Sequence, residues 1–262
     1  MENLTELVPE LVEICQRASD AILAIYDCPE NYNIQSKSDE SPVTAADLVA
    51  NDIILEGLTR LTPEVPIMSE ESIIDWEERK SWQQYWLVDP LDGTKDFIAR
   101  NGEFCIAIAL MDQDEPLLGF IFQPVTGDYY WGSRVLGSFH GRQRLNGFRT
   151  DDNEFRVVGS RRLKHRGPWF DWLQQTDFNI QRIQQGSALK FCRLAEGQAD
   201  LYPRIGPTCE WDTAAGQAIL EGAGGLLVDS DGHRFRYNKP KLLNPHFYAL
   251  RDPRWLSSLL EL

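Results

Sequence analysis

The chain has 262 residues, of which 42% are hydrophobic, with a formal net charge of −14 and five cysteines. A chain of this length can bury a large core without disulfides, and its acidity argues against a nucleic-acid polymer or an anionic membrane surface as the main partner, because both attract a basic face. The odd number of cysteines, with no Cys-x-x-Cys pair, predicts free thiols in a reducing compartment and no zinc site.

The amino-terminal residues predict neither a secretory signal nor a membrane span. Glu2 and Glu6 stand where a signal peptide carries positive charge, and the longest apolar run, residues 104–111, is too short to cross a bilayer. We therefore expect a cytoplasmic protein without a transmembrane segment, either a monomer or a homodimer. An acidic protein that acts on a phosphorylated small molecule needs bound divalent cations to reverse its local field.

Two amphipathic helices are predicted first. Apolar residues at helical spacing predict a helix over residues 4–27, and the polar residues 30–41 predict a loop. The second helix begins at Thr44 as N-cap with Asp47 three residues later, a capping box in which Asp replaces the usual Glu. Its predicted buried stripe consists of Leu48, Ile53, Ile54, Leu55, Leu58 and Leu61. Capping alone explains Asp47 unless it faces the same pocket as Thr94.

A short buried strand is predicted over residues 65–69. It delivers Glu70 and Glu71 at its carboxyl end, the end at which α/β proteins generally build their sites, so one of the two could be a metal ligand. A surface helix that contains Trp76 and Trp82 is predicted next.

Two aspartates leave the end of the following strand together. Residues 85–88 are apolar, and Asp89 and Asp92 follow on either side of Pro90, which we expect to end the strand. Residues 93–97 predict a tight turn and a short helix, whose free N–H groups would point at an anion. An ordinary turn prefers the same residue types, so this segment alone leaves both interpretations open.

The rest of the chain predicts an antiparallel meander and then alternating strands and helices. The meander strands are expected at residues 104–111, 117–123 and 129–131. Later strands are expected at 155–158, 178–183, 200–202 and 226–228, with helices at 169–175, 187–196 and 212–221. Such alternation is typical of an α/β unit with a mostly parallel sheet. The polar residues 142–154 suggest a boundary, so we predict an α+β part over 1–150 and an α/β part over 151–262.

Four acidic residues lie where a strand or loop meets a helix, namely Glu70, Asp89, Asp92 and Asp212. Hard oxygen donors of this kind suit Mg²⁺ when it also binds phosphate and water. Asp212 stands at a predicted helix start, where capping is the simpler explanation of a single aspartate. The shared residue type at four junctions favours a metal site.

The order and spacing of these segments resemble the inositol monophosphatase superfamily of metal-dependent, lithium-sensitive phosphatases. The matching segments are Ser-Glu-Glu at 69–71, Trp-Leu-Val-Asp-Pro-Leu-Asp-Gly-Thr at 86–94 and Trp-Asp-x-Ala-Ala-Gly at 211–216. Residues 41–47, 100–104, 186–192 and 195–204 look most similar to the CysQ-type 3'(2'),5'-bisphosphate nucleotidases. One departure is Leu163, where relatives show a His, so the residues that contact the base stay open.

The resemblance implies a five-layer αβαβα sandwich, of α+β and α/β halves, and two or three Mg²⁺ ions between the halves. The implied metal ligands are Glu70, Asp89, the Leu91 carbonyl, Asp92 and Asp212, with Asp89 bridging a pair of ions. In the implied catalytic pair, Asp47 accepts from the Thr94 hydroxyl and helps to deprotonate the attacking water. The implied substrate-binding residues are Glu70, Leu91, Asp92, Gly93, Thr94, Ser187, Lys190, Arg204 and Asp212.

The implied reaction is hydrolysis of the 3'(2')-phosphate of adenosine 3',5'-bisphosphate, or of its phosphosulfate, which would clear a by-product of sulfate activation. Arg204 suits a second phosphate, whereas inositol phosphatases carry an acidic residue in this region. Lys190 could reach the same anion or could be an exposed helix lysine. Resemblance also implies a cytoplasmic protein, either free or peripheral on the inner membrane.

Other functions stay open at this stage. An inositol monophosphatase-like sugar phosphatase is the main alternative. A haloacid dehalogenase-type phosphatase also has an Asp-Gly-Thr string after a strand, but its two aspartates are separated by one residue, and here Pro90 and Leu91 intervene. A protein that binds metal or nucleotide without catalysis would be expected to lack a ligand or the Asp47 and Thr94 pair, and the sequence has them all.

Overall fold

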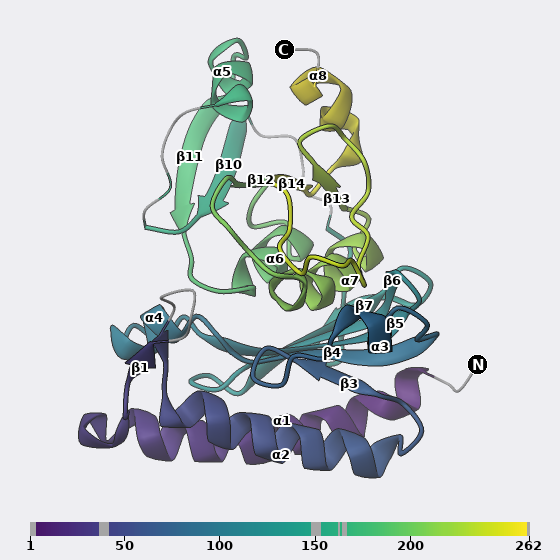
Figure 1. Cartoon of the computed structure of the whole chain (residues 1–262). Coiled ribbons are helices and arrows are strands. Elements are labelled where there is room, and N and C mark those ends of the chain that lie inside the picture. Colours follow the sequence, from purple (N-terminus) through teal and green to yellow (C-terminus); the bar gives the residue numbers. More distant parts are fainter. Residues whose placement is uncertain (1–3, 37–41, 148–152, 162, 164–166, 261–262) are drawn as a thin grey trace.

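Helical layers and β-sheets alternate through the molecule (Figure 1), which confirms the predicted five-layer αβαβα sandwich. The computed structural model describes residues 4–36, 42–147, 153–161, 163 and 167–260. The first layer holds α1 (Leu4–Tyr26) and α2 (Ala45–Leu61), the middle layer holds α6 (Leu189–Ala195) and α7 (Ala214–Gly222), and the outer layer holds α5 (Pro168–Gln174) and α8 (Leu256–Leu260). Each sheet is therefore covered on both faces.

The first sheet has seven strands in the order β3-β4-β5-β6-β7-β8-β9, of which β3 and β4 are parallel and the other neighbours antiparallel. They are β3 (Ile67–Ser69), β4 (Gln84–Asp92), β5 (Cys105–Asp112), β6 (Glu115–Gln123), β7 (Asp128–Ser133), β8 (Gly137–His140) and β9 (Gln143–Leu145). The predicted meander is confirmed. The structure adds β8 and β9, and β9 lies inside the polar stretch that we interpreted as a boundary, because pairing with β8 orders it without an apolar pattern.

The second sheet has the order β11-β10-β12-β14-β13. Its strands are β10 (Glu154–Gly159), β11 (Asn179–Gln184), β12 (Leu201–Arg204), β13 (Leu226–Asp229) and β14 (Phe247–Leu250). β10 pairs in parallel with β11 and β12, whereas β14 runs antiparallel to both β12 and β13. The expectation of a mostly parallel sheet is therefore wrong, because the unpredicted β14 inserts between its neighbours. The boundary predicted near residue 150 lies outside the described residues and stays a prediction.

The cores follow the layers. Both faces of β5 are buried, as its uninterrupted apolar run requires. One core joins α1 and α2 to the first sheet, around Leu11, Ile54 and Trp86, and another joins α6 and α7 to both sheets. Leu48 was predicted to be buried but is 46% exposed, since the buried face of α2 is centred near Ile54 and Leu48 lies about 120° around the helix from it.

Short elements complete the fold. The segment predicted as a loop contains the 3-10 helix η1 (Pro29–Asn31) and the strand β1 (Gln35–Ser36), which pairs with β2 (Pro42–Val43). The remaining elements are α3 (Trp76–Arg79), α4 (Thr94–Ile98), η2 (Glu210–Asp212) and η3 (Pro253–Trp255). All five cysteines are free. Among the described residues, every helix is too short or too polar to cross a membrane.

Candidate active site

The carboxyl end of β4 carries the centre of the site. We expected the strand to end at Pro90, and this prediction is wrong: β4 continues to Asp92. Asp89 pairs with Ala107 and Asp92 with Cys105, so a bulge lies between the two pairs. Two residues of β4 thus oppose one of β5, and Pro90 falls where the ladder is interrupted, so its missing N–H costs no hydrogen bond. The bulge releases both aspartates from the regular side-chain alternation.

The turn after the bulge requires glycine. Gly93 has φ 97°, in the left-handed region, and an added Cβ would lie 3.2 Å from both the Glu103 carbonyl oxygen and the Ser187 Cβ. α4 begins at Thr94, as predicted. The turn is therefore in close contact with the segment that precedes β5 and with the segment that leads into α6.

Thr94 and Asp47 are hydrogen-bonded. The Thr94 hydroxyl donates to Asp47 Oδ1 at 3.0 Å, while Asp47 Oδ2 accepts from the main-chain N–H and the hydroxyl of Thr44, at 2.8 and 2.6 Å. The predicted capping box is thus present, and the same carboxylate also reaches the site. Burial raises the pKa of Asp47, and the hydrogen bonds from Thr44 and Thr94 oppose this effect.

Three carboxylates, one buried and two partly buried, converge in the site. Glu70, Asp89 and Asp212 can bring their oxygens within 4.8 Å of one another. Burial and then the charges of Glu70, Asp92 and Asp212 raise the pKa of Asp89 well above its usual range, and burial together with Asp92 and Glu70 raises the pKa of Asp212 to about 8. Carboxylates that repel one another in a buried place fit a divalent cation, which supplies the missing positive charge.

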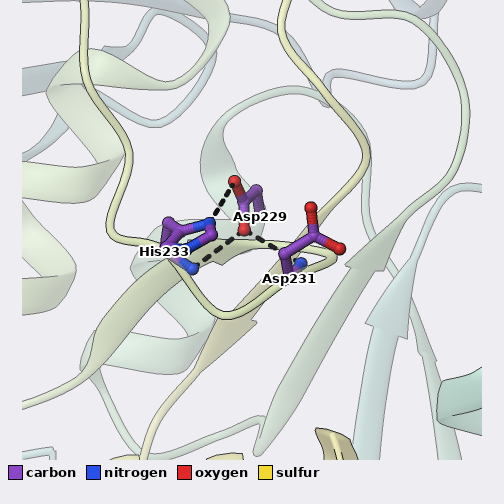
Figure 2. A group of neighbouring side chains, drawn as sticks. All are labelled: Asp229, Asp231 and His233. Carbon is purple, nitrogen blue, oxygen red and sulfur yellow. Dashed lines mark hydrogen bonds and ion pairs between the residues drawn. The ribbon is translucent and has the colours of Figure 1, made fainter.

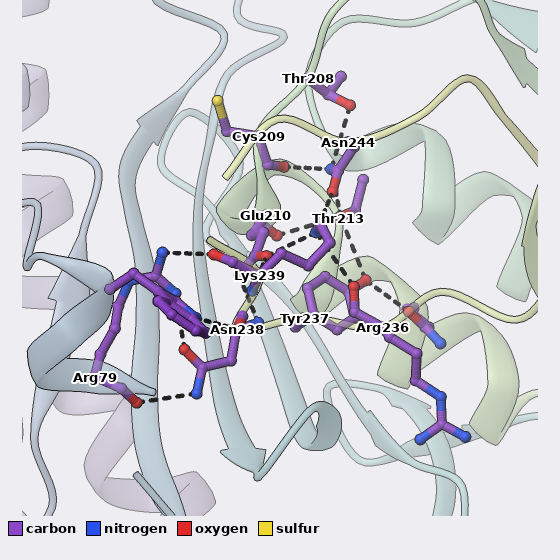
Figure 3. A network of polar contacts seen from close by, with 12 residues as sticks. Arg79, Thr208, Cys209, Glu210, Thr213, Arg236, Tyr237, Asn238, Lys239 and Asn244 are labelled. Carbon is purple, nitrogen blue, oxygen red and sulfur yellow. Dashed lines mark hydrogen bonds and ion pairs between the residues drawn. The ribbon is translucent and has the colours of Figure 1, made fainter. Parts of the chain in front are cut away.

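A polar network surrounds Glu210 (Figure 3), which lies in the same short helix as Asp212. Asp212 ends η2 instead of opening α7, which starts at Ala214, and its Oδ2 accepts the N–H of Cys209 at 2.7 Å. Two residues earlier, the buried carboxylate of Glu210 accepts from Asn238 N, Lys239 N and Lys239 Nζ at 2.9, 2.9 and 2.6 Å.

Arg79 of α3 ties this network to the first half of the chain. Its guanidinium donates to Asn238 Oδ1 at 2.7 Å and to the Lys239 carbonyl at 2.6 Å (Figure 3), and the side chain is buried. The loop that carries Asp212 is therefore fixed from both sides of the site. The sequence offered no reason to expect the residues Arg79, Glu210, Asn238 and Lys239 here, because the contacts among them join positions 28 to 160 residues apart.

Two cations, Lys190 and Arg204, lie near the carboxylate of Asp92. Lys190 is 4% exposed, so it is not the exposed helix lysine of the alternative interpretation; its Nζ donates to the Ser187 carbonyl and lies 5.2 Å from the centre of the Tyr202 ring. Arg204 donates from Nη2 to the Pro207 carbonyl at 3.0 Å, and its buried Nε has no hydrogen-bond partner among the described residues. The charges of Lys190 and Arg204 oppose the burial that raises the pKa of Asp92.

One cavity of about 950 Å³ joins these groups. The predicted residues that line it are Glu70, Asp89, Leu91, Asp92, Gly93, Thr94, Ser187, Lys190, Arg204 and Asp212. Asp47 does not line the cavity and contacts it through Thr94. Leu163 lies on the wall together with Ile205 and Leu243. Arg161 and Asp96 also line it and were not predicted.

A second acidic group, Asp229, Asp231 and His233, lies at the surface (Figure 2). Asp229 Oδ1 accepts the N–H groups of Asp231 and His233 at 2.9 and 2.8 Å. These bonds are those of an Asx-type turn after β13 and account for the grouping, so we assign no site to it.

Comparison with known proteins agrees with this geometry. The model of the inositol monophosphatase family matches residues 3–259. The chain is 43% identical to the 3'(2'),5'-bisphosphate nucleotidase CysQ of Salmonella typhimurium and 42% identical to that of Escherichia coli, over 92% of this chain and 98% of each relative. The crystal structure of CysQ from Bacteroides thetaiotaomicron superposes with a TM-score of 0.80 at 34% identity, covering 95% of this chain and 98% of that one. The chain belongs to the inositol monophosphatase family.

Proposed function

We propose that this protein hydrolyses the 3'(2')-phosphate of adenosine 3',5'-bisphosphate to AMP and phosphate, with Mg²⁺ as its cofactor. The observation that carries the proposal is the combination of charges in one cavity, which is lined both by a cluster of carboxylates and by Lys190 and Arg204. The carboxylates suit the metal, and the two cations suit a phosphate that does not react. The names of the relatives support the same substrate.

The side chain of Arg204 is the strongest reason to expect a second phosphate on the substrate. Its buried Nε lacks a partner among the described residues, and a buried donor left unsatisfied costs about 1–3 kcal/mol. A phosphate oxygen would satisfy this donor in the bound state. An ester with a single phosphate at the metal site would leave it unpaired, which favours a bisphosphate.

The residues divide the reaction between them. Glu70, Asp89, the Leu91 carbonyl, Asp92 and Asp212 are the proposed ligands of two or three Mg²⁺ ions. When bound, the ions lower the pKa of water and stabilise charge on the phosphoryl oxygens. Because the Thr94 hydroxyl donates to Asp47, its lone pairs are free to accept from the attacking water and pass its proton toward that carboxylate. The N–H groups of Gly93 and Thr94 are proposed to hold the reacting phosphate.

A panel of phosphate esters tests the proposal. Phosphate release would be measured with Mg²⁺ and with excess EDTA for adenosine 3',5'-bisphosphate, its 2',5' isomer, the 3'-phosphosulfate and inositol 1-phosphate. We expect the bisphosphates to have the higher kcat/KM and EDTA to abolish turnover. A preference for the inositol ester would show that the protein is a sugar phosphatase. Turnover that survives EDTA would exclude Mg²⁺ as a required cofactor. A role in removing the by-product of sulfate activation, the cytoplasmic location and the oligomeric state stay predictions.

A further inference from the structure

We propose that Glu103 is a positioning residue that fixes the spacing between the two phosphate subsites. This inference rests on the proposed function. Glu103 belongs to the segment 100–104 that marks the resemblance but has no role in the chemistry above, and it is not one of the proposed metal ligands. It precedes β5 in the first half of the chain, whereas the groups that it binds belong to the second half.

Three N–H groups converge on the Glu103 carboxylate. Oε2 accepts the main-chain N–H of Gly186 at 2.7 Å and Nη1 of Arg161 at 2.8 Å, while Oε1 accepts Nη2 of Arg161 at 2.8 Å. The guanidinium is thus bound in a bidentate manner, the geometry that orients a carboxylate most strongly. Arg161 also pairs with Asp96 at 3.3 Å. The Glu103 side chain is 21% exposed, so solvent screens these contacts only in part.

The carbonyl oxygen of Glu103 lies close to two glycines of the site. A Cβ on Gly93 would lie 3.2 Å from the Glu103 carbonyl oxygen, and a Cβ on Gly186 would lie 2.6 Å from the same oxygen. The turn proposed to hold the reacting phosphate and the segment before α6 therefore both pack against the carbonyl oxygen of Glu103. A shift of Glu103 would disturb both contacts.

The segment that Glu103 holds carries the residues proposed for the second phosphate. Gly186 is followed by Ser187, whose φ of 52° leaves little conformational freedom, and then by Ala188, whose N–H donates to Asp92 Oδ2. Lys190 donates to the Ser187 carbonyl. A shift at Gly186 would therefore move Lys190 and would strain the contact to Asp92.

Charge and position make opposite predictions for this residue. If Glu103 acted only through its charge, removing that charge would make the potential at the cavity more positive. KM for an anionic substrate would then fall. If Glu103 acts by position, removing it releases Gly186 and Arg161 and raises KM. The direction of the change in KM therefore separates the two roles.

Steady-state kinetics with adenosine 3',5'-bisphosphate provide the test. We expect Glu103→Ala to raise KM about tenfold, the scale of one hydrogen bond to a charged group, with a smaller change in kcat. Glu103→Gln, whose amide oxygen can still accept from Gly186, should raise KM by less. The matched control is Glu115→Ala, which breaks another ion pair between the halves, Glu115 to Arg234 at 2.9 Å, outside the cavity lining. This control should leave KM unchanged.

A readout without turnover keeps the inference separate from the proposed function. Hydrogen exchange of the Gly186 amide, measured without substrate or Mg²⁺, should accelerate in Glu103→Ala and not in Glu115→Ala. If wild type fails to hydrolyse the bisphosphate but the exchange result holds, the function is wrong and the positioning contact stands. If wild type hydrolyses the bisphosphate while Glu103→Ala shows lowered or unchanged KM, or unchanged exchange, the inference is overturned.

Discussion

The hydroxyl of Thr94 donates to Asp47 Oδ1 at 3.0 Å, although Asp47 also caps the helix in which it lies. A single carboxylate uses one oxygen to fix the start of α2 and the other to hold a side chain at the end of β4. Because the cap immobilises Asp47, the Thr94 hydroxyl is oriented before substrate binds. Structure and proposed catalysis share this residue.

Thr94→Ala should lower kcat about 10²-fold or more, the usual scale for a lost general-base element, because the attacking water loses its acceptor. The Mg²⁺ concentration for half-maximal activity should change little, since Thr94 is not a proposed ligand. Thr94→Ser, which keeps the hydroxyl, should retain most of kcat. If Mg²⁺ affinity collapses in Thr94→Ala, the residue supports the metal site instead.

Thr44→Ala is the matched variant on the other side of Asp47. It removes a capping side chain and should lower the free energy of unfolding by about 1 kcal/mol. The bond from Thr94 to Oδ1 stays, so kcat should remain within about twofold of wild type. Urea unfolding and kinetics on one preparation measure both. A loss of kcat as large as that of Thr94→Ala would show that the two oxygens cannot be separated.

Asp89→Asn should abolish turnover and should not destabilise the metal-free protein. The amide has nearly the shape of the carboxylate and relieves repulsion from Glu70, Asp92 and Asp212, so Tm in EDTA should equal or exceed that of wild type. Asp231→Asn, in the surface turn, is the control and should leave activity intact. A fall in Tm of several degrees in Asp89→Asn, or wild-type turnover at saturating Mg²⁺, would contradict the metal assignment.

Arg204→Ala should cost about 1.5–3 kcal/mol in kcat/KM for a bisphosphate nucleotide, the range for hydrogen bonds to charged groups. It should cost much less for an inositol monophosphate, which presents no second phosphate to the guanidinium. The ratio of the two losses is obtained from four kcat/KM values. An equal loss on both substrates would mean that Arg204 supports the fold or the metal site and does not select the substrate.

Lys239→Met tests whether the network around Glu210 positions Asp212. The variant leaves the buried Glu210 carboxylate with two main-chain donors and no cation, which should lower the free energy of unfolding by about 3 kcal/mol. Because Asp212 lies two residues further on, the Mg²⁺ requirement should also rise. Destabilisation with an unchanged Mg²⁺ titration curve would show that the network holds the fold alone.

The parts of the site that the sequence predicted depend on local chemistry. The capping box of Thr44 and Asp47 and the left-handed turn at Gly93 each follow from residues a few positions apart. The strands of the meander follow from apolar runs that are buried on both faces. These features are nearly independent of the rest of the chain, so a reading of the sequence alone can find them.

The features that the sequence did not predict depend on distant contacts. Pro90 lies within β4 because a bulge accommodates it, and β14 pairs with strands that precede it by more than a dozen residues. Lys190 is buried because α6 lies between two sheets. The contacts of Glu103 with Gly186 span 83 residues, and no local pattern marks them. Such interactions are decided by packing, which periodicity does not report.

The most direct test of the account is the identity of the nucleoside product formed from adenosine 3',5'-bisphosphate with Mg²⁺. The acidic cluster and the cations Lys190 and Arg204 line one cavity, and we assign the reacting phosphate to the cluster and the second phosphate to the cations. We predict AMP, with its phosphate at the 5' position, together with one equivalent of inorganic phosphate. Adenosine 3'-monophosphate as the product, or no phosphate release at saturating Mg²⁺, would contradict it.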